Sequence, residues 1–296
     1  MEEGGKAFNT QVQRLPFNYQ FLRMLMNERF FLYLDILGFT ELVRQGSEKI
    51  DDLYEVIASL NVHNHDIFKV IVFSDTIVVY NVDGGDTPED ARYLIMFMCE
   101  FVRDLMYRLM KREVYFRAII TYGDFTHYEI NGTPCFYGNA LIDAYHSEKE
   151  LKAIGLFIDK KISHHCEIFK YREFNENYDF VYVTQCLDDI EMYGSCGFPI
   201  PSELIESTNL KWFILPEIEH VNNMYIGSKN DNYTGSVRKK YATSWDMYCK
   251  HYPHLTTQLL LSGNDVTSIA PDVEWKEVFD IYPEDYSYAI ETKIAY

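Results

Sequence analysis

Two aspartates, Asp35 and Asp75, are the residues of this chain that could take part in catalysis, judged by their residue type and sequence context. Asp35 lies inside an apolar run, residues 30–39, and Asp75 lies between the two β-rich runs of residues 67–82. A carboxylate in apolar surroundings is costly unless it is paired or bound to a metal ion. Two converging carboxylates would suit Mg²⁺ or Mn²⁺, which prefer oxygen ligands. Taken singly, Asp35 could instead cap a helix, and Asp75 could be an ordinary turn residue.

The pattern of apolar residues predicts the elements that must position these aspartates. In order along the chain they are a strand at 30–39, a helix at about 40–60, a hairpin within 67–82 broken at 73–76, a helix at 89–111, a strand within 114–125, a loop that becomes a helix after Gly138, and a strand at 155–159. This β-α-β-β-α-β order, with additions, is that of the ferredoxin-like fold. In such an arrangement the first strand and the hairpin are neighbours in one sheet, so the two aspartates could converge.

Four segments, taken together, resemble class III adenylate and guanylate cyclases. DILGFT, at residues 35–40, resembles the first metal-binding motif of that family, and FSDTIVVY resembles the second, with Ser74 in place of the usual Gly. FRAIITYGDF is similar to the family's Arg-containing strand, and YGNALIDAYHSEKEL resembles its dimerisation and catalytic segment. DILGFT is the most specific of the four, and the common order of the others adds to it. The resemblance covers about residues 28–190 and implies an α+β, ferredoxin-like class III cyclase domain.

In that family, paired aspartates hold two metal ions while a nucleoside triphosphate is closed into a 3′,5′-cyclic monophosphate. The resemblance implies that Asp35 and Asp75 are catalytic metal ligands and that the carbonyl of Ile36 is a further ligand. It also implies two Mn²⁺ or Mg²⁺ ions per site as cofactors. The backbone amides from Leu37 to Thr40, at the start of a helix, would bind phosphate.

The positions that read the base and hold the ribose depart from the family's pattern. Purine cyclases read the base with a Lys or Glu where this chain has Ile71, and a second reading position holds Cys135. The family's Asn and Arg at the ribose and transition state are replaced by Ile142 and His146. Three alternatives remain: a purine cyclase with an unusual pocket, a pyrimidine cyclase, or a non-catalytic nucleotide-binding module. The residues that could replace the lost pair are Arg117, Asn139, Asp143 and His146.

The bacterial pyrimidine cyclases of anti-phage signalling fit these departures better. Their pattern G-x-A-L-x-x-A-Y-x-x-E is matched here by Gly138, Ala140, Leu141, Ala144, Tyr145 and Glu148. Arg117 matches the start of their strand, and Lys240 and Tyr241 match a C-terminal KY-x-x-W pattern, with Trp245 one residue late. This resemblance implies a uridylate or cytidylate cyclase, a head-to-tail homodimer, and an antiviral role in which a separate effector protein binds the cyclic product. UTP is slightly favoured over CTP, because Arg117 could donate to a carbonyl.

The expected contacts to the substrate surround the two aspartates. Tyr54 could reach the base with its ring and hydroxyl, Phe39 and Phe73 could supply apolar contact, and Arg117, also expected to be catalytic, could pair with a base carbonyl or a phosphate. Tyr54 could instead be a core residue, and Arg117 could form a salt bridge with an acidic residue. The full set of expected substrate-binding residues is Gly38, Phe39, Thr40, Tyr54, Phe73, Arg117 and Asn139.

Composition narrows the classes of partner. The chain has 296 residues, of which 47% are hydrophobic and 24% charged, as in ordinary globular proteins. Its formal net charge of −18 repels nucleic acid and anionic lipid, so neither is an expected partner. The six cysteines form no CxxC pair, no apolar run approaches the length of a membrane span, and no signal peptide is evident. These features predict a cytoplasmic protein.

The chain is expected to contain three segments. Residues 1–27 are expected to be disordered or loosely packed, residues 28–190 to form the cyclase domain, and residues 191–296 to form an extension that packs on it. In this extension a helix is predicted at 236–252, among stretches that look irregular or weakly patterned.

Overall fold

The computed structural model describes residues 28–60, 65–83, 85–110, 112–206 and 211–281. The strands of this part are β1 Glu28–Ile36, β2 Phe68–Phe73, β3 Thr76–Asn81, β4 Phe116–Asp124, β5 Thr126–Ile130, β6 Thr133–Tyr137, β7 Gly155–Asp159, β8 Tyr171–Glu173 and β9 Tyr178–Val181. Its α-helices are α2 Phe39–Gln45, α3 Ser47–Ala58, α4 Pro88–Met110, α5 Asn139–Glu150, α6 Cys186–Gly194, α7 Ser202–Glu206, α8 Lys211–Lys229, α9 Gly235–His251, α10 Pro253–Leu261 and α11 Lys276–Ile281. Short 3₁₀ turns lie at Ser163–His165 and Val266–Ile269.

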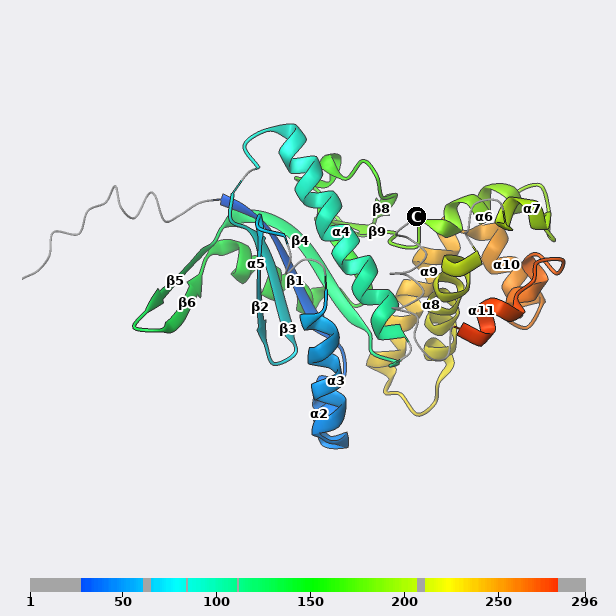
Figure 1. The fold of residues 1–296 in the computed structure, drawn as a ribbon, viewed down its shortest axis with the longest axis horizontal. Helices are drawn as coiled ribbons and strands as arrows, with labels where there is room; N and C mark the ends of the chain where they lie inside the picture. Colours follow the sequence, from blue (N-terminus) through cyan, green and yellow to red (C-terminus); the bar gives the residue numbers. More distant parts are fainter. Residues whose placement is uncertain (1–27, 61–64, 84, 111, 207–210, 282–296) are drawn as a thin grey trace, which may run out of the picture.

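The described strands form a seven-stranded sheet in the order β2-β3-β1-β4-β7-β9-β8, and β5 and β6 form a separate hairpin (Figure 1). Helices α2 and α3 connect β1 to β2, and α4 connects β3 to β4. The order β2-β3-β1-β4, with antiparallel neighbours, is that of the ferredoxin-like fold. Strand β7 is parallel to β4 and is reached through α5. The fold is therefore α+β, as the sequence predicted.

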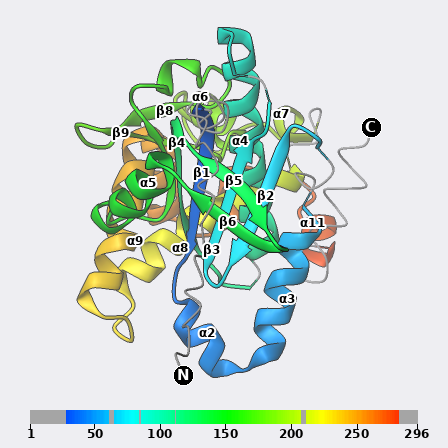
Figure 2. The same cartoon turned by 90° about the vertical axis from the view of Figure 1, so that its left-hand side faces the viewer.

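The side chains of β1 alternate between the two faces of the sheet. Leu34 and Ile36 belong to the main core, which also contains residues of α3 and α4. Phe31 and Tyr33 belong to a smaller core on the opposite face, which contains residues of α5. Asp35 continues the series of Phe31 and Tyr33, so it stands on the face of the smaller core. In Figure 2 the β5–β6 hairpin crosses in front of this face.

Two local features differ from the prediction. The single helix expected at 40–60 is two helices, because Gly46 interrupts it with a φ of 127° that favours glycine. The loop expected before Gly138 contains the β5–β6 hairpin. Its turn residues, Asn131 and Gly132, have φ values of 52° and 78°. Asn-Gly is the dipeptide that favours a tight two-residue hairpin turn, because both central residues need positive φ.

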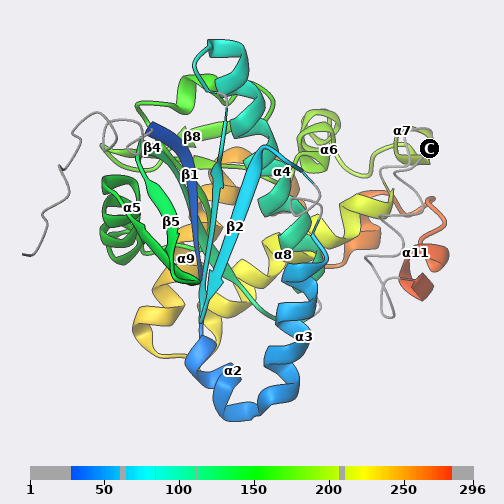
Figure 3. The ribbon, with the colours of Figure 1, turned by 60° about the vertical axis from the view of Figure 1, so that its left-hand side comes forward.

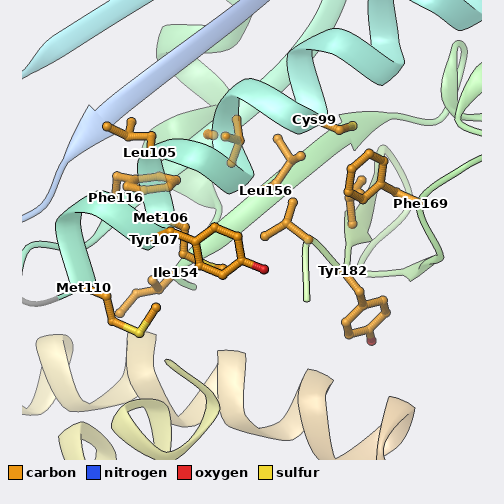
Figure 4. Close-up of a cluster of buried hydrophobic side chains, with 14 of the residues drawn as sticks. Cys99, Leu105, Met106, Tyr107, Met110, Phe116, Ile154, Leu156, Phe169 and Tyr182 are labelled. Carbon is orange, nitrogen blue, oxygen red and sulfur yellow. The ribbon is translucent and has the colours of Figure 1, made fainter. Parts of the chain in front are cut away.

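The C-terminal helices share the main core with the sheet. Figure 4 shows Tyr107 and Met110 of α4 and Ile154 close to C-terminal helices, and buried residues of α8 and α9 belong to the same cluster. Helix α9 confirms the helix predicted at 236–252. The stretch expected to be irregular contains α8 instead, with Pro216 inside the helix. None of the helices in the described residues combines the length and apolarity that crossing a membrane requires.

Candidate active site

The register of the sheet brings the two aspartates together at the end of β1. Asp35 pairs with Thr76 across β1 and β3, and Asp75 directly precedes Thr76. The amide of Ile36 donates a hydrogen bond to the carbonyl of Asp75 at 2.8 Å. Ser74, with a φ of 54°, forms the tight turn that carries the chain from β2 to Asp75. The two aspartates are therefore held side by side by backbone structure alone.

The charged form of Asp35 is destabilised in this position. Burial raises the pKa of Asp35 to about 7; the charges of Glu148 and Asp75 add to the rise, while Arg117 opposes it. Nearby carboxylates and desolvation both disfavour the charged form of an acid. A divalent cation would remove this cost, since its own charge dominates the local field.

The donor set fits a hard divalent cation that retains open coordination positions. Asp35 and Asp75 offer carboxylate oxygens, and the Ile36 carbonyl is adjacent in the chain. Among the described residues, no group of three or more His, Cys, Asp or Glu side chains is arranged to hold a metal ion. Mg²⁺ commonly binds through one or two carboxylates and takes its other ligands from water and substrate phosphates. The residues present therefore fit a cation that is shared with a phosphorylated substrate.

The raised pKa of Asp35 predicts a pH-dependent effect on stability. Because the folded chain binds a proton at Asp35 more tightly than the unfolded chain, metal-free stability should fall as pH rises from about 4 to about 7. Asp35→Asn removes this charge and should raise the free energy of unfolding by about 1–2 kcal/mol at pH 8, allowing for solvent screening. Urea unfolding in EDTA between pH 5.5 and 8 measures it, and a gain that does not grow with pH would contradict the assignment.

Arg117 in β4 is the register partner of Asp35 in the neighbouring strand β1, and it is 1% exposed. Its Nε donates to the carbonyl of Ala153 at 3.0 Å, and its Nη1 forms an ion pair with Glu148 of α5. Its Nη2 is buried and has no hydrogen-bond partner among the described residues. The salt bridge that the sequence left open as an alternative is thus present, and the buried Nη2 is left without a partner among the described residues.

Two of the three aromatic candidates, Tyr54 and Phe73, lie at the turn before Asp75. The hydroxyl of Tyr54 donates to the carbonyl of Ser74 at 3.1 Å, so it ties α3 to this turn. Phe73 is 42% exposed, and its ring centroid lies 5.8 Å from that of Phe136 in β6. Phe39 is half-buried against the main core. Of these three, Phe73 is the side chain most open to a ligand.

Ile71 occupies the position at which the resemblance places a base reader. It pairs with Val78, which in turn pairs with Tyr33 of β1. Ile71 therefore lies on the same face as Asp35, two residues farther along the strands. Its side chain offers apolar contact and no hydrogen bond. Cys135, the second reading position, is half-buried in β6 opposite Tyr128.

Asn139 is not brought to the aspartates within one chain. Its side-chain amide donates to Asp124 at 2.6 Å, and Asp124 pairs with Glu28 at the start of β1. Asp35 lies seven residues farther along β1, which at about 3.3 Å per residue is a separation of about 23 Å. Within one chain, Asn139 therefore lies too far from the aspartates to share a metal ion with them.

The backbone amides predicted to bind phosphate differ in whether they already make a hydrogen bond. Leu37 already donates its amide to the carbonyl of Tyr115 at 2.8 Å. Gly38, with a φ of 75°, and Thr40 are exposed at the beginning of α2. The structure therefore leaves Gly38 and Thr40, but not the amide of Leu37, open to a ligand.

Several solved structures are similar to part of this chain. The adenylyl cyclase CyaB from P. aeruginosa is 11% identical with a TM-score of 0.43, and the match covers 52% of this chain and 93% of that one. The monomeric guanylyl cyclase domain of the RhoGC fusion protein from Blastocladiella emersonii is 16% identical with a TM-score of 0.41, over 53% and 95%. The guanylate cyclase domain of RhGC from Catenaria anguillulae, in complex with GTP, is 13% identical with a TM-score of 0.41, over 53% and 97%.

No protein-family model matches the chain. No curated protein sequence matches it significantly. With identities and TM-scores this low, the function has to be inferred from the side chains of the site.

Two further charged residues lie near Asp35, although the sequence indicated them only as members of a pattern. The charge of Glu148 of α5 raises the pKa of Asp35, and the charge of Lys240 of α9 weakly opposes that rise. Nothing in the local sequence around Lys240 shows that its charge acts on Asp35, because that influence depends on how α9 packs.

The cavity between α2, α3 and the segment before β4 does not include the aspartates. This cavity of about 330 Å³ is lined by residues of α2 and α3, including Asp52, and by Arg112 and its neighbours before β4. Asp52 and Arg112 form an ion pair there. Neither Asp35 nor Asp75 lines this cavity.

Proposed function

We propose that this chain is a metal-dependent nucleotide cyclase that converts UTP or CTP into the 3′,5′-cyclic monophosphate and pyrophosphate. The observation that carries the proposal is the pair Asp35 and Asp75, fixed side by side at the end of β1, with Arg117 in the adjacent strand. When bound, a divalent cation would neutralise the phosphates and favour attack by the ribose 3′-hydroxyl on the α-phosphorus.

The chain's own residues would act by fixing charged groups around the phosphates of the substrate. Asp35 and Asp75 would bind the cations, with the Ile36 carbonyl as a neighbouring ligand. The Nη2 of Arg117 would donate a hydrogen bond to a phosphate oxygen, while Glu148 and the Ala153 carbonyl keep the guanidinium oriented. Such preorganisation is the main protein contribution to phosphoryl transfer.

Pyrimidine specificity is supported by Ile71, which stands where purine cyclases carry a Lys or Glu. With Ile71 and Phe73, the sheet next to the aspartates offers apolar contact instead of a purine-reading group. The slight preference for UTP depended on Arg117 donating to a base carbonyl. Arg117 is buried against Glu148 and is paired in the sheet with the metal-binding Asp35, so we assign it to the phosphates of the substrate and not to its base. UTP and CTP then become equal candidates.

A head-to-tail homodimer is the second part of the proposal. Large apolar side chains are exposed on α5 and on the β5–β6 hairpin, at Tyr128, Ile130, Tyr137, Ile142 and Tyr145. Exposed apolar residues on neighbouring elements favour a protein partner. A second copy docked there could also bring Asn139 or His146 to a substrate. An anti-phage role, with an effector protein that binds the cyclic product, is proposed from the sequence resemblance alone.

The test is to incubate the purified chain with ATP, GTP, CTP or UTP and Mn²⁺, and to separate the products by chromatography. A cyclic pyrimidine product is the expected result. Cyclic AMP or cyclic GMP would show a purine cyclase with an unusual pocket, and no product with nucleotide still bound would show a non-catalytic module. In the same assay the activity per chain should fall on dilution, because a shared site requires the dimer; a constant value would argue against the dimer.

A further inference from the structure

Helix α9, in the C-terminal part of the chain, is fixed against the segment that directly precedes β7. The buried hydroxyl of Ser244 accepts a hydrogen bond from the amide of Ile154 at 2.7 Å and donates to the carbonyl of Ile154 at 2.8 Å. Ala153, the preceding residue, accepts the hydrogen bond from Arg117. The same short segment therefore holds both the guanidinium of the site and the middle of α9.

The neighbouring turn of α9 is fixed by aromatic contacts. Tyr241 packs edge-on against Tyr115, with 5.5 Å between ring centroids, and Tyr115 accepts the amide hydrogen bond of Leu37 just after β1. Gly227 of α8 lies so close to the ring of Tyr241 that a Cβ there would come within 2.4 Å of it. Helix α9 thus packs against α8 and against Tyr115, the residue before β4. Figure 3 shows α8 and α9 behind the sheet in that view.

Lys240 is placed by these contacts. It lies four residues before Ser244, on the same side of α9, and directly before Tyr241. Lys240 is half-buried and makes no ion pair among the described residues. Burial lowers the pKa of Lys240, and the charges of Arg117, Glu148 and Asp35 act on it as well. Because no ion pair occupies it in the described part of the chain, the side chain of Lys240 is open to an anionic ligand.

Two observations at this place indicate an anion. The Nη2 of Arg117 is a buried donor with no partner in the described part of the chain. Lys240, from a different part of the sequence, adds a second cation close enough for the charge of Arg117 to act on it. A polyphosphate would offer acceptors to both, and charge-assisted hydrogen bonds to phosphate are among the stronger ones in proteins.

We propose that Lys240 binds the β- or γ-phosphate of the triphosphate, so that the C-terminal helices complete the phosphate side of the site in the same chain. This inference rests on the proposed function, since it assigns a further contact to that substrate. Lys240 would also hold the pyrophosphate until release. The C-terminal part is then a component of the site and not only a cover for the sheet.

Binding of inorganic tripolyphosphate in the presence of Mg²⁺, measured by calorimetry on the full chain, tests the proposal. Lys240→Gln should weaken binding about tenfold or more, since one charged contact is lost. Lys240→Arg should retain most of the affinity. Lys239→Gln, which removes the exposed neighbouring lysine, is the matched control and should bind like the unmodified chain. With nucleotide, Lys240→Gln should raise KM more than it lowers kcat.

Unchanged tripolyphosphate affinity in Lys240→Gln would overturn the proposal. The same holds if this variant is less stable to heat but binds tripolyphosphate as tightly as the unmodified chain. Failure of the unmodified chain to bind tripolyphosphate would overturn it too. The proposed function fails separately, if no cyclic product forms from any nucleotide. A chain that makes a cyclic nucleotide, with the same KM in Lys240→Gln, would retain the function and lose only this inference.

Discussion

Asp75→Asn should lower nucleotide turnover by about 1000-fold or more and leave the fold intact. Loss of a residue that merely orients a metal ligand typically costs 10–100-fold in metal affinity or activity, so loss of a ligand itself should cost more. The fold should survive because Asp75 contributes to the β1 end through its backbone carbonyl, which asparagine retains. Asp35→Asn should have a similar effect on turnover.

The measurement is the initial rate of cyclic product formation at saturating Mn²⁺, with circular dichroism to confirm the fold. Asp66→Asn is the control, because Asp66 is an exposed acid just before β2 and belongs to no site element. Turnover by Asp75→Asn within tenfold of the unmodified chain would remove the metal role of the pair and, with it, the proposed mechanism.

Arg117→Met should lower the free energy of unfolding by about 3 kcal/mol. Arg117 is 1% exposed and its partner Glu148 has a side chain that is 16% exposed, so the substitution leaves a carboxylate with little solvent and without its ion-pair partner. Removing one member of a buried ion pair typically costs about 3–5 kcal/mol. Lost hydrogen bonding to the Ala153 carbonyl adds to the effect.

Urea unfolding of the single variants Arg117→Met and Glu148→Gln and of the double variant measures this coupling. The double variant should recover part of the loss, because it leaves no unpaired charge, and the difference from additivity gives the pair's interaction energy. A single Arg117→Met variant as stable as the unmodified chain would show that the pair does not stabilise the fold. In that case Glu148 would not be the group that fixes the guanidinium.

Much of the core fold is readable from local sequence. The apolar run before Asp35, the break at 73–76 and the helical period of 89–111 each report a periodicity that a short segment carries by itself. These elements are found as β1, the β2–β3 hairpin and α4. The pairing of Asp35 with Asp75 followed from the order of those elements, since a ferredoxin-like sheet has its first strand beside its hairpin.

Other elements were missed although their signals are local. The turn at Asn131 and Gly132 is a standard hairpin signal, but the flanking strands are short and largely exposed, so their apolar pattern is weak. Helix α8 is buried on many sides and therefore has little amphipathic contrast, and Pro216 within it argued against a helix. Burial against the rest of the chain, not intrinsic pattern, stabilises such helices.

The sequence by itself determined the aspartate pair, the strands that hold it and the unusual residue at position 71. Only the tertiary structure decided which charges surround the pair. Arg117 is bound to Glu148, Asn139 lies at the far end of β1, and Lys240 approaches from α9. The physical reason is that ion pairs and approaches between distant segments depend on how helices pack on the sheet, and no local periodicity records that packing.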